Sequence, residues 1–171
     1  MWTLRPYRSS DYAAFLELEI ETALLSMDGA TDEERGALGE RLPDQLRTFY
    51  GFSAATGPTR FGGRVSVLEV DERYGGHLFT IEDREVFTGA ERLWVTSLAV
   101  IGALRGQGFG RVLIAHAEAE ARARGIQRLA LGVAESNARA RRLYDRTGFL
   151  TTRLVMERNL GAEGPGPTRQ T

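Results

Sequence analysis

The sequence predicts a mixed α/β fold, with a mostly antiparallel sheet that carries one parallel strand pair and is flanked by helices. Apolar, β-branched runs at 65–70, 77–88 and 93–100 follow one another through short turns, as antiparallel strands do. A glycine-rich turn and a helical stretch then separate 93–100 from another apolar run at 128–134. Because a crossover helix joins parallel strands, these last two strands are expected to be parallel.

The N-terminal third predicts one strand, two helices and a loop. Residues 2–7 have the apolar character of a strand, and apolar residues then recur at helical spacing over 12–27. A second helix is predicted over 31–49. Pro43 is expected to kink or split this helix, because proline lacks the backbone donor that a helix interior needs. The glycine-rich stretch 51–63 predicts a loop.

The C-terminal half predicts further elements after the glycine turn. A helix is expected to end at Gly125, since glycine favours the position after a helix. A helix over 137–147 follows the parallel strand, with Ser136 as its candidate cap. Residues 150–160 predict a final strand or pair of strands. The tail 161–171 has no apolar anchor and is expected to be disordered.

The turn between strand 93–100 and its helix indicates an anion-binding site. Gly106, Gly108 and Gly110 alternate there. Glycine reaches positive φ and lets a ligand approach the backbone, while the first amides of a helix have no intrahelical partner. With the helix dipole, these amides favour a phosphate or pyrophosphate. A plain connecting turn has the same composition. The spacing excludes two nucleotide motifs, because no glycine precedes a lysine and Gly110 falls one position early for G-x-G-x-x-G.

Two motifs together resemble the GNAT superfamily of N-acetyltransferases. The turn RGQGFG at 105–110 is similar to the family's acetyl-CoA loop, Gln/Arg-x-x-Gly-x-Gly/Ala. The run SNARARRLYDRTGF at 136–149 is similar to the family's Asn-x-x-Ala-x-x-Leu-Tyr-x-x-x-Gly-Phe pattern. In that run the matching residues are Asn137, Leu143, Tyr144, Gly148 and Phe149, with Ala138 and Ala140 near the alanine position. The resemblance is strong over about 93–149 and looser before it.

The resemblance implies where the cofactor lies. In the family the central parallel strands splay apart and acetyl-CoA wedges between them, here between 93–100 and 128–134. The residues that would hold acetyl-CoA are Leu98, Ala99, Val100, Arg105, Gly106, Gln107, Gly108, Phe109, Gly110, Asn137 and Tyr144. Asparagine is also a common helix cap, so Asn137 has a structural alternative. Arg105 is expected either to face phosphate or to lie in solvent.

The resemblance also implies a catalytic acid. The family's tyrosine lies beside the CoA sulfur, so Tyr144 is expected to protonate the leaving thiolate, the alternative being a tyrosine that only packs on the core. Glu82 is the preferred general base among four acidic residues on or near the strands. Each of these is also a candidate for a solvent-facing charge, and ordered water could replace a base. The four are Glu82, Asp83, Glu85 and Glu91.

Composition limits the remaining possibilities. The 171 residues suit one domain over 1–160, and a net charge of −1 provides no basic field for nucleic acid. There are no cysteines, and His77 and His116 are far apart, so no metal site is expected. All 22 basic residues are arginine. Without a signal peptide or a long apolar span, we expect a cytoplasmic monomer or homodimer away from membranes.

The function that these features favour is N-acetyl transfer from acetyl-CoA to a primary amine of a small molecule or peptide. Alternatives are a non-catalytic acyl-CoA-binding sensor and an interaction protein that kept the fold. Protein N-termini, polyamines, aminoglycosides and amino acids all remain open as acceptors. A cationic acceptor is suggested by acidic residues, since opposite charge attracts amines. These residues are Asp28, Asp32, Glu33, Glu34, Glu82, Asp83 and Glu85.

Overall fold

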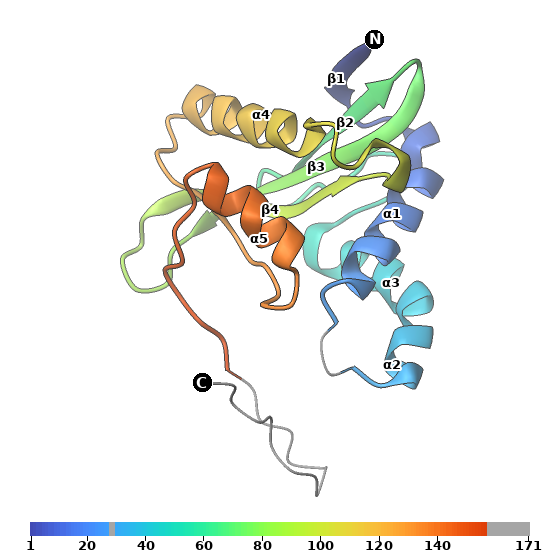
Figure 1. Cartoon of the computed structure of the whole chain (residues 1–171), viewed down its shortest axis with the longest axis horizontal. Helices are drawn as coiled ribbons and strands as arrows, with labels where there is room; N and C mark the ends of the chain where they lie inside the picture. Colours follow the sequence, from blue (N-terminus) through green and yellow to red (C-terminus); the bar gives the residue numbers. More distant parts are fainter. Residues whose placement is uncertain (28–29, 157–171) are drawn as a thin grey trace, which may run out of the picture.

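A five-stranded sheet in the order β1-β2-β3-β4-β5 forms the centre of the computed structural model, which describes residues 1–27 and 30–156 (Figure 1). The strands are β1 (Trp2–Pro6), β2 (Arg64–Val70), β3 (Arg73–Arg84), β4 (Glu91–Val100) and β5 (Leu129–Leu131). The α-helices are α1 (Tyr12–Leu24), α2 (Asp32–Gly36), α3 (Leu38–Tyr50), α4 (Phe109–Ala123) and α5 (Ala138–Arg146). Neighbouring strands are antiparallel except β4 and β5, which are parallel. The predicted fold class is confirmed.

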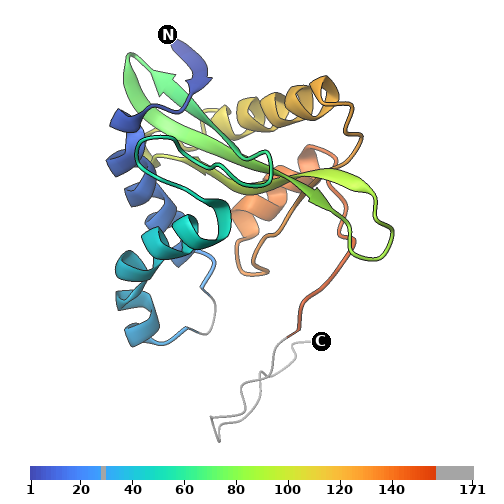
Figure 2. The ribbon, with the colours of Figure 1, turned by 180° about the vertical axis from the view of Figure 1, so that it is seen from behind.

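The helices cover the two faces of the sheet, and the core divides accordingly. Val67 of β2 is fully buried with Phe15 of α1 and Leu46 of α3. The next residue, Leu68, is fully buried with Leu113 of α4. Successive strand residues point to opposite faces, so α1 and α3 cover one face and α4 covers the other (Figures 1 and 2).

The β2–β3 hairpin is tighter than the sequence predicted. Asp71 and Glu72 have φ of 48° and 62°, the positive values that suit a two-residue turn between twisted strands. Strand β3 therefore begins at Arg73, and two predicted turn glycines lie within the strand. A Cβ on Gly76 would lie 2.3 Å from the carbonyl oxygen of Ala99, so glycine allows β3 and β4 to approach closely here.

A β-bulge interrupts β4 at the point where its parallel partner ends. Phe79 faces Ser97 and Thr80 faces Val95, so Thr96 is the extra residue on β4. The pairing of β4 with β5 ends at Val95. Beyond this point residues 96–100 of β4 have no β5 partner. The predicted separation of the parallel strands therefore begins at the bulge.

Pro43 does not split its helix, contrary to one form of the prediction. Helix α3 continues through Pro43, and the break falls earlier, at Ala37, which ends α2 and begins α3. The missing donor of Pro43 removes one backbone hydrogen bond, that to Gly39, and the neighbouring turns remain helical. Thr31 caps α2, since its hydroxyl accepts from the amide of Glu34 at 3.2 Å.

The predicted final strand over 150–160 is wrong for residues 150–156, which form no strand. Arg153 contacts the β3–β4 hairpin instead: it pairs with Glu85 at 2.6 Å and lies 4.8 Å from the Phe87 ring. The apolar side chains of this segment remain exposed rather than packed on the sheet. Residues 157–160 and the tail 161–171 lie outside the described residues. No helix in the described part of the chain is long and apolar enough to cross a membrane.

Candidate active site

The glycine turn presents free backbone donors at the start of α4. Gly106 and Gly108 have φ of 84° and 89°, and a Cβ on either would meet nothing within 4 Å. Within the described residues, the amides of Gly106, Gly108, Phe109 and Gly110 donate to no protein acceptor. Four convergent N–H groups at the positive end of a 15-residue helix fit an anion such as pyrophosphate.

Arg105, the first residue of this turn, is held by the protein. Its Nε donates to the carbonyl of Val100 at 2.9 Å, and its guanidinium pairs with Glu21 of α1. These contacts fasten the end of β4 to α1. In this structure the side chain neither extends freely into solvent nor crosses the open space above the glycines. Gln107 likewise folds back, and its amide donates to the carbonyl of Ala103 at 3.0 Å.

The edge of β4 leads directly into the turn. Leu98, Ala99 and Val100 lie beyond the last β4–β5 pair, between the bulge and the glycine turn. An unpaired strand edge offers backbone donors and acceptors to an extended ligand. Only Ile101 and the 3₁₀ helix Gly102–Leu104 separate this free edge from the glycine turn, an arrangement that suits a ligand with an extended chain and a phosphate end.

Helix α5 brings the second motif to the same place. Its cap is Asn137, whose Oδ1 accepts from the amide of Ala140 at 3.1 Å, so the prediction of Ser136 as cap is wrong. A Cβ on Gly110 would lie 2.8 Å from Leu143 Cδ2, which shows that α5 rests on the first turn of α4. A Cβ at position 110 would make the Leu143 side chain shift.

Tyr144 follows Leu143 on α5. Its ring packs edge-to-face on Phe149, with centroids 5.5 Å apart. Burial raises the pKa of the Tyr144 hydroxyl, so the phenol keeps its proton at neutral pH. Neither Tyr144 nor Phe149 belongs to a core cluster of the described residues, so packing on the core stays a prediction. The protonation state of Tyr144 suits a proton donor.

Glu82 lies away from the glycine turn. Its Oε1 accepts from Arg124 at 2.9 Å, just after the C-terminal end of α4, whereas the turn opens the N-terminal end. A helix of 15 residues spans about 22 Å. The structure thus brings α5, the helix that carries Tyr144, to the turn but does not bring Glu82 there.

The acidic residues that suggested a cationic acceptor do not form one cluster. Asp28 lies outside the described residues, and α2 lies across the molecule from the β3–β4 hairpin in both views (Figures 1 and 2). Near the hairpin, Asp83 pairs with Arg92 at 2.6 Å and Glu85 pairs with Arg153. Arginine therefore already neutralises the hairpin carboxylates.

A buried polar network, which was not among the predicted features, lies under α1. Glu19 Oε1 and His77 Nε2 are 2.5 Å apart, and Ser97 Oγ contacts the same carboxylate oxygen. The Tyr74 hydroxyl lies 2.5 Å from His77 Nδ1. His77 is fully buried, and Glu19 and Ser97 are 9% and 8% exposed. The network therefore connects α1, β3 and β4 beside the bulge.

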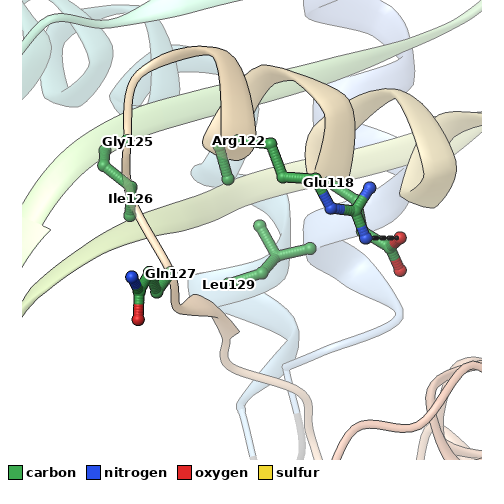
Figure 3. Close-up of a pocket in the computed structure, with 7 residues that line it drawn as sticks. Glu118, Arg122, Gly125, Ile126, Gln127 and Leu129 are labelled. Carbon is green, nitrogen blue, oxygen red and sulfur yellow. Dashed lines mark hydrogen bonds and ion pairs between the residues drawn. The ribbon is translucent and has the colours of Figure 1, made fainter.

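The hollow drawn in Figure 3 is a different feature. It has a volume of about 430 Å³ and lies where α4 ends and the chain turns into β5. Its walls include Ile126, Leu129 and the ion pair of Arg122 with Glu118 at 3.0 Å. Because it lies at the C-terminal end of α4, it does not include the glycine turn.

The mixed sheet with one parallel strand pair and the open glycine turn suit an acyltransferase. The chain belongs to the GNAT acetyltransferase family, whose family model matches residues 28–149. Members of this family use acetyl-CoA as acetyl donor. The search of curated proteins found no match.

Solved structures share the fold. A proposed acetyl transferase from Pyrococcus furiosus superposes with a TM-score of 0.74 at 19% identity, covering 94% of this chain and all of the other. A GCN5-related N-acetyltransferase from Ralstonia eutropha gives 0.70 at 20% identity, covering 94% of this chain and 100% of that one. A predicted acetyltransferase from Clostridium acetobutylicum, solved with acetyl-CoA, gives 0.63 at 15% identity, covering 94% and 97%.

Proposed function

We propose that this acetyltransferase is an N-acetyltransferase that transfers the acetyl group of acetyl-CoA to a primary amine of a small molecule or peptide. The observation that carries the proposal is the closeness in the chain of the free β4 edge to the open amides of Gly106, Gly108, Phe109 and Gly110. A second motif, on α5, rests against this turn.

The residues present fit acetyl-CoA as the bound donor. The amides at the start of α4 would bind the pyrophosphate, and the backbone of Leu98, Ala99 and Val100 would bind the extended pantetheine arm. Acetyl-CoA supplies the activated thioester. Asn137 keeps the start of α5 in place through its cap and leaves its amide group free to donate to the donor substrate.

Tyr144 supplies a proton in this proposal. In the transfer, a bond forms between the amine nitrogen and the acyl carbon, the carbon–sulfur bond breaks, the nitrogen loses a proton and the sulfur gains one. A phenol whose pKa is raised by burial stays protonated until the thiolate develops. Because the thiol has an ordinary pKa of about 8.5, a nearby donor stabilises the departing sulfur.

A non-catalytic acyl-CoA sensor is the alternative, since the same amides would bind CoA without turnover. Tyr144 favours the enzyme, because a sensor has no need of a protonated phenol near the β4 edge. Turnover separates the two functions directly.

The test is a panel of primary amines with acetyl-CoA, followed by colorimetric detection of free thiol. The panel contains amino acids, polyamines, aminoglycosides and peptides with free N-termini. The chain has no cysteine, so every thiol detected is CoA released by the reaction. Acetylated product, confirmed by mass spectrometry, is the expected result. CoA binding by calorimetry without turnover of any amine would support the sensor instead.

A further inference from the structure

Glu19 is a buried carboxylate without an arginine partner. Among the described residues, the buried carboxylate of Asp11 pairs with Arg5 at 2.8 Å, and the carboxylate of Glu120, whose side chain is 8% exposed, pairs with Arg124. Glu19 is buried to the same degree but faces His77. A buried anion is unfavourable unless hydrogen bonds or an opposite charge compensate it. The contacts around Glu19 show which of its oxygens is compensated.

The hydrogen-bond network assigns all donors to one carboxylate oxygen. Burial and then the charge of Glu19 raise the pKa of Tyr74, so its hydroxyl keeps its proton. His77 lies between the two groups, with Nδ1 2.5 Å from the Tyr74 hydroxyl and Nε2 donating to Glu19 Oε1 at 2.5 Å. Ser97 Oγ donates to the same carboxylate oxygen. Two donors thus hold Oε1 and fix the orientation of the side chain. Within the described residues Oε2 makes no hydrogen bond, and the side chain stays 11% exposed.

The free oxygen lies beside the place where the parallel strands separate. Ser97, which contacts Glu19, is the second residue after the last β4–β5 pair. The bulged residue Thr96, next to Ser97, has a buried hydroxyl that makes no hydrogen bond among the described residues. Burial, and then the charge of Glu19, raises the pKa of Tyr50 on α3. One carboxylate oxygen that makes no hydrogen bond therefore lies beside the bulge.

The order of the residues along β4 indicates how far Glu19 lies from the thioester end of a bound acetyl-CoA. The glycine turn comes after Val100 in the chain, beyond Ile101 and the 3₁₀ helix Gly102–Leu104. Going back along β4, from Val100 towards Thr96, therefore leads away from the backbone amides that would bind the pyrophosphate. A strand rises about 3.3 Å per residue, so Thr96 lies about 13 Å from Val100 along the strand. An extended arm on residues 98–100 would therefore bring its thioester end towards the bulge and Glu19.

We propose that Glu19 is the acceptor-binding carboxylate, which binds the substrate as an ammonium ion and takes its proton on Oε2. The inference rests on the proposed function and names the residue that recognises the amine. The nitrogen–hydrogen bond breaks, an oxygen–hydrogen bond forms on Oε2, and the neutral amine keeps the electron pair that attacks the acyl carbon. His77, Ser97 and Tyr74 are positioning residues that act through Oε1.

Two CoA thioethers test this assignment without knowledge of the natural acceptor. S-(2-aminoethyl)-CoA carries an ammonium group two carbons beyond the sulfur, and S-propyl-CoA carries a methyl group in the same place. Calorimetry at pH 7 measures the Kd of each for the wild-type chain and for Glu19→Gln. A charge-assisted hydrogen bond predicts that the wild type binds the ammonium analogue at least about tenfold more tightly. In Glu19→Gln the two affinities should agree within about twofold.

Glu17→Gln is the matched control, because Glu17 lies on the same helix but is exposed. It should keep the wild-type preference, which separates the role of Glu19 from the general charge of α1. Equal affinities of the two analogues for the wild type would overturn the assignment, and this comparison needs no variant that folds. A preference that survives in Glu19→Gln would overturn it too. If neither analogue nor CoA binds, the proposed function fails, and the assignment fails with it.

Discussion

Replacing Gly108 with valine should separate the conformational role of this residue from its role in binding. Gly108 has φ of 89° and caps α4, and a Cβ built on it meets nothing within 4 Å. The Cβ of valine would therefore clash with no protein atom, but the residue would be forced into the left-handed region. That conformation costs about 1–2 kcal/mol for a residue with a Cβ. For a chain of this size the loss corresponds to a fall in Tm of about 2–8 °C.

The affinity of Gly108→Val for CoA should fall by more than its loss of thermal stability explains. The open space beside Gly108 is where a ligand would approach the free amides, and valine would fill part of it. We expect the Kd for CoA, measured by calorimetry at a temperature where the variant is folded, to rise at least about tenfold, because the pyrophosphate loses charge-assisted hydrogen bonds.

Gly89 provides the control. It has φ of 67°, also has nothing within 4 Å of a built Cβ, and lies in the β3–β4 hairpin. Gly89→Val should therefore lose a similar amount of thermal stability and keep the wild-type affinity for CoA. If Gly108→Val and Gly89→Val bind CoA equally well, the amides at the start of α4 do not bind the pyrophosphate.

Three further predictions concern catalysis, pH and the helix break. Tyr144→Phe should lower kcat about 10²–10⁴-fold with little change in Tm or CoA affinity, and an unchanged rate with chemistry rate-limiting would contradict the acid role. Desolvation raises the pKa of Asp11, but hydrogen bonds from Arg5 and the Arg8 amide outweigh it and the pKa lies below its usual value. The ionised Asp11 carboxylate therefore stabilises the fold above about pH 4, and this stabilisation is lost as the pH falls further. Asp11→Asn should lower the free energy of unfolding by about 3 kcal/mol at pH 7 and should make this free energy depend less steeply on pH in the acid range. An equally steep dependence in the variant would refute this. Pro43→Ala should raise the free energy of unfolding in urea by about 1–3 kcal/mol, since it restores a helix donor, and a loss of stability would show that proline suits this site.

Local patterns predicted the parts of the site that are local in the chain. The glycine turn, the strand before it and the helix after it occupy 93–123 without interruption, and the structure has all three where the sequence placed them. The parallel orientation of β4 and β5 followed from the helix between them. The end of α4 at Gly125, with φ of 71°, was likewise a local signal.

Features that depend on distant partners were not predictable in this way. Glu82 was a candidate base because of its strand, but its partner Arg124 is 42 residues away. The alternation of residues along a strand predicts which face of the sheet a side chain lies on. It does not predict which arginine lies opposite that side chain. The apolar pattern at 150–160 likewise shows strand propensity, whereas a strand also needs an edge to pair with. Residues 150–156 pair with none.

The position of Glu19 shows which sequence signal was available for the acceptor site. Phe15 and Glu19 are four residues apart, so they share one face of α1, and Phe15 is fully buried. An acidic residue in line with a core phenylalanine must be compensated by a partner inside the fold. His77 gave the complementary signal, since it opens the apolar run HLFTI, which is buried in β3 up to Thr80. By contrast, Glu82 and Asp83 stand where β3 returns to solvent, and arginines compensate both. A charged residue on the buried face of an amphipathic helix therefore indicates the proposed acceptor site around Glu19 better than acidic residues near a hairpin do.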